Sequence, residues 1–272
     1  MNTYSVFKHL AFRLDPEFTH DSTLKIANTS PWLASFFNAT KPNEKLELKT
    51  PVLTFPFPVG VAAGFDKNAI AIPFFEKLGF GALEVGTVTK KPQIGNPKPR
   101  ISRHPSINSL QNAMGFPNSG ADKIFKNMTE NLPKKMKLGT NIGKNKDTSE
   151  LETPNDYLYL YKKFAPISDY MAINISSPNT PGLRSFQKKD KLKPIVEAIS
   201  SGQKESKKKP TFLKIAPDLE ESEKHRVHFA RGVRNSYSRL KKSHEARNAS
   251  LSLIDDLYSG MMDNLLKGEP RG

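Results

Sequence analysis

The sequence predicts an α/β fold of the (β/α)8 TIM-barrel type, incomplete, with a helical extension at its N-terminus. Three observations support this prediction. From residue 51 onward, short apolar segments alternate with helical ones, as in a parallel sheet. Each apolar segment ends in polar or glycine-rich sequence, as the strands of such barrels do. No Gly-x-Gly-x-x-Gly follows the first strand and no Walker A motif occurs, which disfavours an open dinucleotide- or ATP-binding sheet.

Residues 1–45 form a separate helical extension in this prediction. Apolar residues between Tyr4 and Leu14 form one face, with Lys8 and His9 among them, and Asp15-Pro16 ends this helix. A second helix is expected to begin near Leu24 and to continue through 31–37. Basic residues beside aromatic ones fit a pair of helices lying on a bilayer surface, and helices packed on their own domain are the alternative.

Residues 46–220 are expected to supply about five strand–helix units of the barrel. The strands are predicted at 58–63, 81–85, 138–142, 170–175 and 211–215. The helices are predicted at 70–78, 121–131, 156–164 and 191–199, and a proline-rich connection precedes the second of them. Residues 221–272 are charged and contain no convincing buried strand, so a divergent helical tail is expected there. Eight strands close such a barrel, and only five are visible in the sequence.

Composition excludes several classes of protein. The chain has 272 residues, a formal net charge of +15 and no cysteine, so disulfides, thiolate metal sites and a cysteine base are excluded. Six histidines occur without a zinc-binding spacing, and we expect no metal site. No apolar run approaches the ~20 residues of a membrane span, and no signal peptide is apparent, so we expect an intracellular protein that at most rests on a membrane face. The lysines lack interleaved aromatic motifs, so no nucleic-acid partner is expected.

The segment from Asn174 to Arg184 is the strongest candidate for a functional site. A buried strand leads into it, and it then places amides, hydroxyls and an arginine around two prolines and a glycine. Asn174 and Asn179 can each donate and accept hydrogen bonds, which suits a planar ligand that carries amide or imide groups. A polar turn that follows a core strand is the alternative interpretation of this segment alone.

The ordered motifs extend this local observation to most of the chain. Residues 4–220 resemble the quinone-dependent, membrane-associated class of dihydroorotate dehydrogenases. The matching segments are 12–17 (FRLDPE), 62–67 (AAGFDK), 84–89 (EVGTVT), 91–100 (KPQIGNPKPR), 112–116 (NAMGF), 141–146 (NIGKNK), 174–184 (NISSPNTPGLR) and 214–219 (KIAPDL). Any one of these would be weak, whereas eight in order are specific.

This resemblance implies oxidation of dihydroorotate to orotate in pyrimidine biosynthesis, with FMN as cofactor and a membrane quinone as electron acceptor. It also implies peripheral attachment to the cytoplasmic face of the cell membrane. Ser177 matches the catalytic base of this class, and the absence of the cysteine that soluble relatives use agrees with it. A hydroxyl that caps the turn before Pro178 is the alternative role for Ser177. Thr180 and Phe116 match positions along the route of the proton.

The other site residues also follow from the resemblance. The residues expected to bind FMN are Ala62, Ala63, Gly64, Lys67, Thr87, Asn141, Asn174 and Lys214. Those expected to bind the substrate are Lys67, Asn112, Ala113, Met114, Gly115, Phe116, Asn174 and Asn179. Arg103 matches a position that lines the quinone tunnel beneath the N-terminal helices.

Two departures from the family pattern lie in the substrate loop, and one lies in the tail. Ala113 stands where arginine is common, and Pro117 replaces a frequent asparagine. The tail lacks the strands that carry the FMN phosphate site of this class. Two alternatives therefore stay open: a truncated, catalytically inactive relative, and a basic protein that binds membrane or nucleic acid through charge alone.

Overall fold

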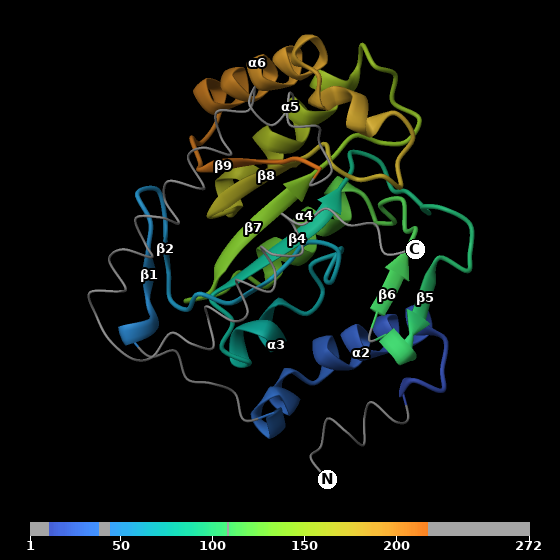
Figure 1. Ribbon diagram of the computed structural model, residues 1–272. Coiled ribbons are helices and arrows are strands. Elements are labelled where there is room, and N and C mark those ends of the chain that lie inside the picture. The colour runs from blue at the N-terminus through green and yellow to red at the C-terminus, as the bar shows by residue number, and fades with distance from the viewer. Residues whose placement is uncertain (1–10, 38–43, 108, 217–272) are drawn as a thin grey trace. The chain divides into compact units, whose positions relative to one another are not determined.

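The computed structural model describes residues 11–37, 44–107 and 109–216. Residues 1–215 belong to one compact unit, and a second unit covers 216–272, where only Ala216 is described. The fold is therefore that of the first unit. Its centre is a parallel sheet with helices packed along it (Figure 1).

The central sheet has five strands in the order β3-β4-β7-β8-β9. Their bounds are Gly60–Val61, Ala82–Val88, Lys137–Ile142, Tyr170–Asn174 and Thr211–Lys214. All four pairings are parallel. The spatial order follows the sequence without the reversal that creates the binding crevice of an open doubly wound sheet. The barrel-type prediction with about five strand–helix units is confirmed, and the carboxyl ends of the strands share one edge.

The inner strands are apolar because both of their faces are covered. Every residue of β8 is buried, and so are five of the six residues of β7. Near-continuous burial of this kind is characteristic of parallel strands between packed layers. The register places Gly139 beside Tyr170 at one end of the sheet and Asn174 beside Lys214 at the other. The amide and ammonium groups of that second pair thus lie at the carboxyl edge.

Four helices follow strands of the sheet: α3 (Ile72–Lys77), α4 (Ala121–Glu130), α5 (Thr153–Phe164) and α6 (Lys189–Glu205). Asp66 fixes the start of α3, because its carboxylate accepts hydrogen bonds from Ile70 N (3.0 Å) and Ala71 N (2.8 Å). Helix α5 packs against α6, β7 and β8. Its Tyr157, Tyr161 and Phe164 are completely buried and fill the layer between sheet and helices. The helix predictions between 121 and 199 agree with these bounds to within a few residues, except that α6 continues to Glu205.

The N-terminal segment begins its helix earlier than predicted. Helix α2 (Pro16–Thr29) starts at the proline, whereas the sequence suggested a break there and a new helix near Leu24. Asp15 is the N-cap and accepts a hydrogen bond from Phe18 N at 2.8 Å, and proline is well tolerated at the first helical position. A 3-10 helix follows at Pro31–Phe37. The helix expected over 4–14 lies mostly outside the described residues.

Two antiparallel hairpins were not predicted. Strand β1 (Leu48–Lys49) pairs with β2 (Thr54–Phe55), and β5 (Ile101–His104) pairs with β6 (Ser109–Asn112). The second hairpin lies in the proline-rich connection, for which the sequence predicts no strand. The strand predicted at 58–63 is shorter, since only Gly60–Val61 pairs before the chain turns into the site. Short 3-10 helices complete the described chain at Glu44–Leu46, Pro105–Ile107, Ala165–Ile167 and Leu183–Gln187.

Candidate active site

The sheet brings the predicted cofactor residues to its carboxyl edge from five consecutive strands. Ala62 and Ala63 directly follow β3, Thr87 lies in β4 and Asn141 lies in β7. Asn174 and Lys214 end β8 and β9. In Figure 1 the arrows of β4 and β7 point in the same direction, toward the side where the β5–β6 hairpin lies. Side chains that are up to 152 residues apart in the sequence, from Ala62 to Lys214, therefore meet in one region.

Three of these side chains form a buried hydrogen-bonded chain. Thr87 Oγ1 donates to Asn141 Oδ1 at 2.6 Å, and Asn174 Nδ2 donates to Thr87 Oγ1 at 3.0 Å. Asn141 Nδ2 donates in turn to Glu84 Oε1 at 2.7 Å. Thr87, Asn141 and Asn174 are each less than a tenth exposed. Buried polar groups that satisfy one another in this way are held in defined orientations, which a binding site requires.

Glu84 anchors this chain, although no role was predicted for it. Its carboxylate also lies 3.5 Å from Lys214 Nζ and accepts a hydrogen bond from Tyr170 OH at 3.4 Å. Burial raises the pKa of Tyr170, with Glu84 adding to the shift, so the phenol stays a neutral donor. Lys214 is thus tethered at the edge of the sheet while its side chain remains 40% exposed. A partly exposed cation beside buried amides is suited to a ligand with developing negative charge.

The turn after β3 forms a small, open cradle. Gly64 N donates to Gly86 O at 2.7 Å, which pins the turn to β4. Gly64 has φ +100°, and a Cβ placed on it would meet no atom within 4 Å. Glycine is required here by its backbone conformation, since the space in front of it is free. Together with Ala62 and Ala63, it leaves room for a flat ring system to approach the backbone.

The loop after β8 carries the predicted base. Ser176 N and Oγ both donate to Asn174 Oδ1, at 3.1 and 3.0 Å, and fold the loop back onto the end of the strand. Ser177 Oγ accepts a hydrogen bond from Asn179 N at 3.2 Å, so its own proton is not used in that contact. The Thr180 hydroxyl is buried and has no hydrogen-bond partner among the described residues. Such an unsatisfied group is uncommon and calls for a functional explanation.

A second loop faces the first across the site. Asn179 Nδ2 lies 3.4 Å from Asn112 O and 3.5 Å from Asn112 Oδ1, so these two asparagines, both predicted to bind substrate, lie side by side. Ala113, Met114, Gly115 and Phe116 follow Asn112 along this loop. Phe116 has φ 55°, a conformation that a bulky residue adopts only under strain. Phe116 packs against the core, where it lies next to Gly143.

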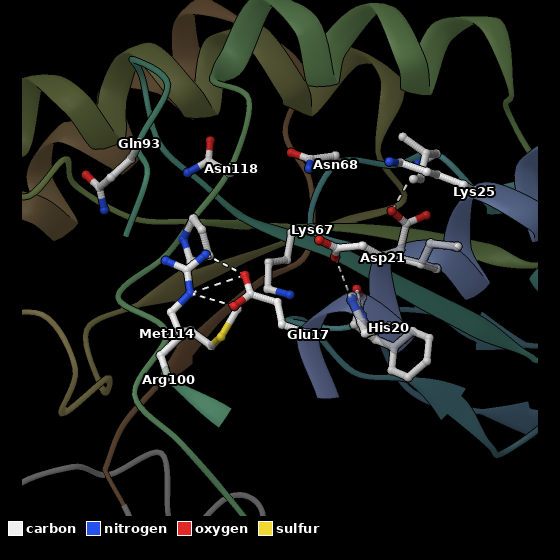
Figure 2. Close-up of a pocket in the computed structure, with 15 residues that line it drawn as sticks. Glu17, His20, Asp21, Lys25, Lys67, Asn68, Gln93, Arg100, Met114 and Asn118 are labelled. Carbon is white, nitrogen blue, oxygen red and sulfur yellow. Dashed lines mark hydrogen bonds and ion pairs between the residues drawn. The ribbon is translucent and has the colours of Figure 1, made fainter. Parts of the chain in front are cut away.

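A cleft of about 350 Å³ lies between this loop and helix α2. Lys67 and Met114 line it from the barrel, and Glu17, His20 and Asp21 line it from α2, as Figure 2 shows. Burial lowers the pKa of Lys67, while the carboxylates of Asp21 and Glu17 oppose that shift. Part of the cleft is closed by His20, whose Nε2 lies 2.8 Å from Phe65 O. The cleft thus joins a predicted substrate residue to the N-terminal extension.

Arg103 does not contact these residues; it contacts the first described residues of the N-terminal segment. Its Nη1 donates to Ala11 O at 3.2 Å and to Leu14 O at 2.8 Å, and its guanidinium lies 4.7 Å from the centre of the Phe12 ring. Arg103 is not among the residues that line the 350 Å³ cleft. Its expected place along a quinone tunnel stays a prediction.

Sequence reasoning missed three residues that organise the site. Glu84 joins Asn141 and Lys214, two of the predicted cofactor residues. Glu17 and Arg100 form a buried ion pair in which Oε1 and Nη2 lie 2.6 Å apart. Each occurs inside a matching motif, yet none carries a local pattern that reveals its partner. The Glu17–Arg100 pair spans 83 residues of sequence. In the described part of the chain no cluster of three or more histidine, aspartate or glutamate side chains could hold a metal.

Comparison with known proteins gives one consistent result. A family model described as "Dihydroorotate dehydrogenase" matches residues 45–235. Dihydroorotate dehydrogenase (quinone) of a Nitratiruptor species is 46% identical over 199 residues, covering 70% of this chain and 56% of the relative. The enzyme of the same name from Pseudomonas syringae pv. tomato is 45% identical over 197 residues, covering 72% of this chain and 57% of the relative.

Solved structures agree with this result. The crystal structure of DHODH from Eimeria tenella in complex with ferulenol has a TM-score of 0.69 and 36% identity, covering 81% of this chain and 66% of that one. The ligand-free structure from the same organism has a TM-score of 0.69 and 38% identity, covering 77% and 64%. The chain therefore spans between about half and two thirds of the length of these relatives. On the matched motifs, the strand order and these likenesses, the chain belongs to the dihydroorotate dehydrogenase family.

Proposed function

We propose that this chain functions in the oxidation of dihydroorotate to orotate, in pyrimidine biosynthesis, with FMN as cofactor and a quinone as the final electron acceptor. The proposal rests on one observation: the groups expected to bind the cofactor and those expected to bind the substrate lie together at the carboxyl edge of the sheet. The buried chain Thr87–Asn141–Asn174 lies beside the open cradle at Gly64, and the two asparagine loops face it. The family and the names of the relatives agree with this chemistry.

The residues at the strand ends fit FMN. The small residues Ala62, Ala63 and Gly64, with open space before them, suit the face of a flat isoalloxazine ring. Thr87, Asn141 and Asn174 offer amide and hydroxyl groups to its polar edge, and Lys214 offers a positive charge. When bound, FMN supplies the acceptor for the hydride that leaves C6 of dihydroorotate. Glu84 keeps Asn141 and Lys214 in place for that role.

Three asparagine amides and one lysine bind the substrate in this proposal. The pyrimidine ring presents alternating N–H and C=O groups, which Asn112, Asn174 and Asn179 complement because each amide both donates and accepts. The substrate also carries a carboxylate, and the ammonium of Lys67 offers a positive charge in the cleft that Met114, from the loop after Asn112, also lines. Residues 113–116 complete the contact, with the strained turn at Phe116 shaping it.

Ser177 takes the proton from C5 in this proposal. Its oxygen accepts from Asn179 N, which orients the hydroxyl and places the base beside a substrate-reading residue. A serine hydroxyl is a weak base, so it needs a dry pocket and an exit for its proton. Thr180 Oγ1, three residues on, is buried without a partner among the described residues and can serve as the next member of that exit route, which Phe116 is also expected to border.

The proposed location is peripheral, on the cytoplasmic face of the cell membrane, with quinone access near Arg103. Large apolar side chains of the N-terminal segment are exposed, including Phe18 (60%), Trp32 (56%) and Phe36 (65%). Among the described helices, none is both long enough and apolar enough to cross a membrane. Exposed aromatics on short helices, in a protein of net charge +15, fit a surface that lies against anionic lipid.

The experiment compares purified wild-type protein with Ser177→Ala and Thr180→Val in an assay of dye reduction driven by dihydroorotate. Wild type is expected to bind FMN, giving a yellow protein, and to turn over. Ser177→Ala is expected to lose about 10²–10⁴-fold in turnover, the usual contribution of a positioned base. Thr180→Val keeps the shape and removes an unsatisfied hydroxyl, so thermal stability should not fall while turnover does. Protein that stays colourless with added FMN and shows no turnover would support the alternative, an inactive relative.

A further inference from the structure

A buried ion pair joins helix α2 to the barrel. Arg100 Nη2 donates to Glu17 Oε1 at 2.6 Å, and Arg100 Nε lies 3.2 Å from both carboxylate oxygens. The two side chains are 6% and 9% exposed, and Figure 2 shows them facing one another at the wall of the cleft. The Arg100 guanidinium holds the pKa of the Glu17 carboxyl below its usual range. An ion pair with several hydrogen bonds of this kind fixes the relative orientation of the two side chains and also holds them together strongly.

The same guanidinium holds a turn of the barrel. Arg100 Nη1 donates to Ile94 O at 2.6 Å and to Asn96 O at 2.9 Å. Gly95, between these two residues, packs so tightly that a Cβ on it would lie 2.4 Å from Met114 O and 2.7 Å from Arg100 Nη1. One side of Arg100 therefore binds α2, and the other side closes the turn at 94–96.

Asn96 extends this contact to both substrate loops. Its Nδ2 donates to Ala113 O at 2.9 Å and to Asn179 O at 3.1 Å, and its backbone N donates to Met114 O at 3.0 Å. The amide fits into the space left by Gly115, where a Cβ would lie 2.7 Å from it. Asn96 is thus bonded to the loop of Asn112 and to the loop of Ser177 and Asn179.

We propose that Arg100 and Asn96 are positioning residues through which helix α2 sets the spacing of the two substrate loops. This inference rests on the proposed function, because it concerns the affinity of the same site for its pyrimidine ligand. A displacement of α2 changes the position of Arg100, and the turn at 94–96 then carries that change to Ala113 and Asn179. The N-terminal extension therefore acts on substrate affinity as well as covering the cleft.

Hydrogen bonds thus connect Arg100 to both substrate loops. The alternative is that the Glu17–Arg100 ion pair only stabilises the fold. The segments 93–100 and 112–118 exchange backbone bonds at Gln93–Asn118, Asn96–Met114 and Ala113–Arg100. If the ion pair only stabilises the fold, its loss lowers stability everywhere. If it positions the loops, its loss loosens these amides first, since local opening is confined to connected units.

The first measurement is amide hydrogen exchange on the full chain. Glu17→Gln keeps the shape of the side chain and removes its charge. Exchange in peptides covering 93–100 and 112–118 should rise about tenfold or more, because an unpaired buried guanidinium is strongly unfavourable. Exchange in the buried strand 137–142 should stay unchanged. No change near 93–118, or an equal rise in the strand, would overturn the proposal.

Lys98→Gln is the matched control. Lys98 Nζ also lies 3.5 Å from Glu17 Oε2, but its side chain is 66% exposed. The substitution removes a positive charge next to the same carboxylate and leaves the contacts of the turn at 94–96 in place. Exchange and affinity are expected to stay as in wild type. An effect as large as that of Glu17→Gln would mean that charge alone, and not the positioning contact, is responsible.

The second measurement is the dissociation constant of orotate, by calorimetric titration. Glu17→Gln and Asn96→Asp are each expected to weaken binding roughly tenfold to a hundredfold, as small misplacements in a site do. Asn96→Asp removes the two donated bonds but leaves the ion pair intact, and it keeps the test decisive if Glu17→Gln does not fold. Wild type that fails to bind orotate would refute the proposed function, and the exchange result would still decide this inference. Unchanged affinity in both variants, with binding wild type, would overturn it.

Discussion

Lys67 is the residue whose chemistry depends most on its surroundings. It lies in the cleft beside α2, where burial lowers its pKa and the carboxylates of Asp21 and Glu17 act in the opposite direction. A partly buried ammonium with a lowered pKa loses its proton at a lower pH than an exposed lysine does. Only the protonated form attracts a carboxylate, so the binding of an anionic pyrimidine should report on this proton.

We predict that orotate binding weakens as the pH rises through the lowered pKa of Lys67, before free lysine would titrate. The sign follows from the charge, since the cation is present below that pKa and absent above it. The dissociation constant is measured over a pH range of roughly 6 to 10 for wild type and for Lys67→Arg. The arginine variant keeps its charge over this range, so its affinity should lack this pH dependence. A wild-type affinity that is constant over the whole range would contradict the prediction.

Among individual residues, the sequence predicted those that are proposed to contact the ligands. It did not reveal the residues that hold these side chains and loops in position. Thr87, Asn141 and Asn174 could be named because motifs of the family carry them, and the structure joins them by hydrogen bonds. Glu84 and Arg100 lie within motifs too, but their roles depend on partners contributed by distant segments. Glu17 is 83 residues from Arg100, and no period or spacing along the chain connects them.

Among the secondary-structure elements, those with continuous burial were the predictable ones. Strand β8 is buried throughout, and the apolar run at 170–175 indicated it almost to the residue. The hairpin β5–β6 lacks that signal, because every residue of β6 is exposed and prolines precede β5. Strand β3 was predicted too long, since its second half leaves the sheet to form the cradle at Gly64. The departures from the simple pattern thus lie in β3 and in the hairpin β5–β6, where the chain leaves the buried sheet.

Close packing between β7 and β8 gives a test of the sheet. Gly139 lies beside Tyr170, and a Cβ on it would lie 2.1 Å from Tyr170 Cζ. Gly139→Ala is expected to lower the free energy of unfolding by about 1–3 kcal/mol, since the ring cannot move away without disturbing Phe55 and Phe212. Thermal melting measures this loss.

The matched comparison is a double-mutant cycle with Tyr170→Leu. The smaller, more flexible side chain makes room for the added methyl, so the double variant should lose less than the sum of the two single losses. Additive losses would show that the clash with Tyr170 is not the cause. FMN binding provides a second readout, because Tyr170 donates to Glu84, which holds Asn141 and Lys214.

For the molecule as a whole, one edge of the sheet concentrates nearly all of the proposed chemistry. Five strands in sequential order bring the predicted cofactor residues together, while helix α2 contacts the loop after β3 through His20 and the end of the hairpin β5–β6 contacts the loop after β8 through Asn112. The family match over residues 45–235 covers the described strands. The sequence predicted this order because it depends only on alternating strands and helices. It could not predict the contact with α2, which depends on side chains that pair across the fold.

The exposed apolar side chains of the N-terminal segment give the last prediction. We expect the full chain to sediment with vesicles that contain anionic phospholipid and to bind less as the salt concentration rises, because salt screens the attraction of its positive charge. Trp32→Ser combined with Phe36→Ser removes two aromatic side chains that contact one another, with ring centres 5.7 Å apart. Vesicle binding should fall about tenfold or more, since each buried aromatic contributes roughly 1.5–3 kcal/mol.

Leu151→Ser is the control for this pair. Leu151 is 89% exposed but lies in the connection before α5, away in sequence from the N-terminal segment. Its loss should leave vesicle binding unchanged, because isolated exposed apolar residues are common on protein surfaces and carry no meaning by themselves. Equal binding by wild type and the Trp32/Phe36 variant, or equal losses in that variant and in Leu151→Ser, would reject a membrane role for this segment. A loss confined to the Trp32/Phe36 variant would place the lipid contact on the N-terminal segment, whose helix α2 also lines the cleft that holds Lys67.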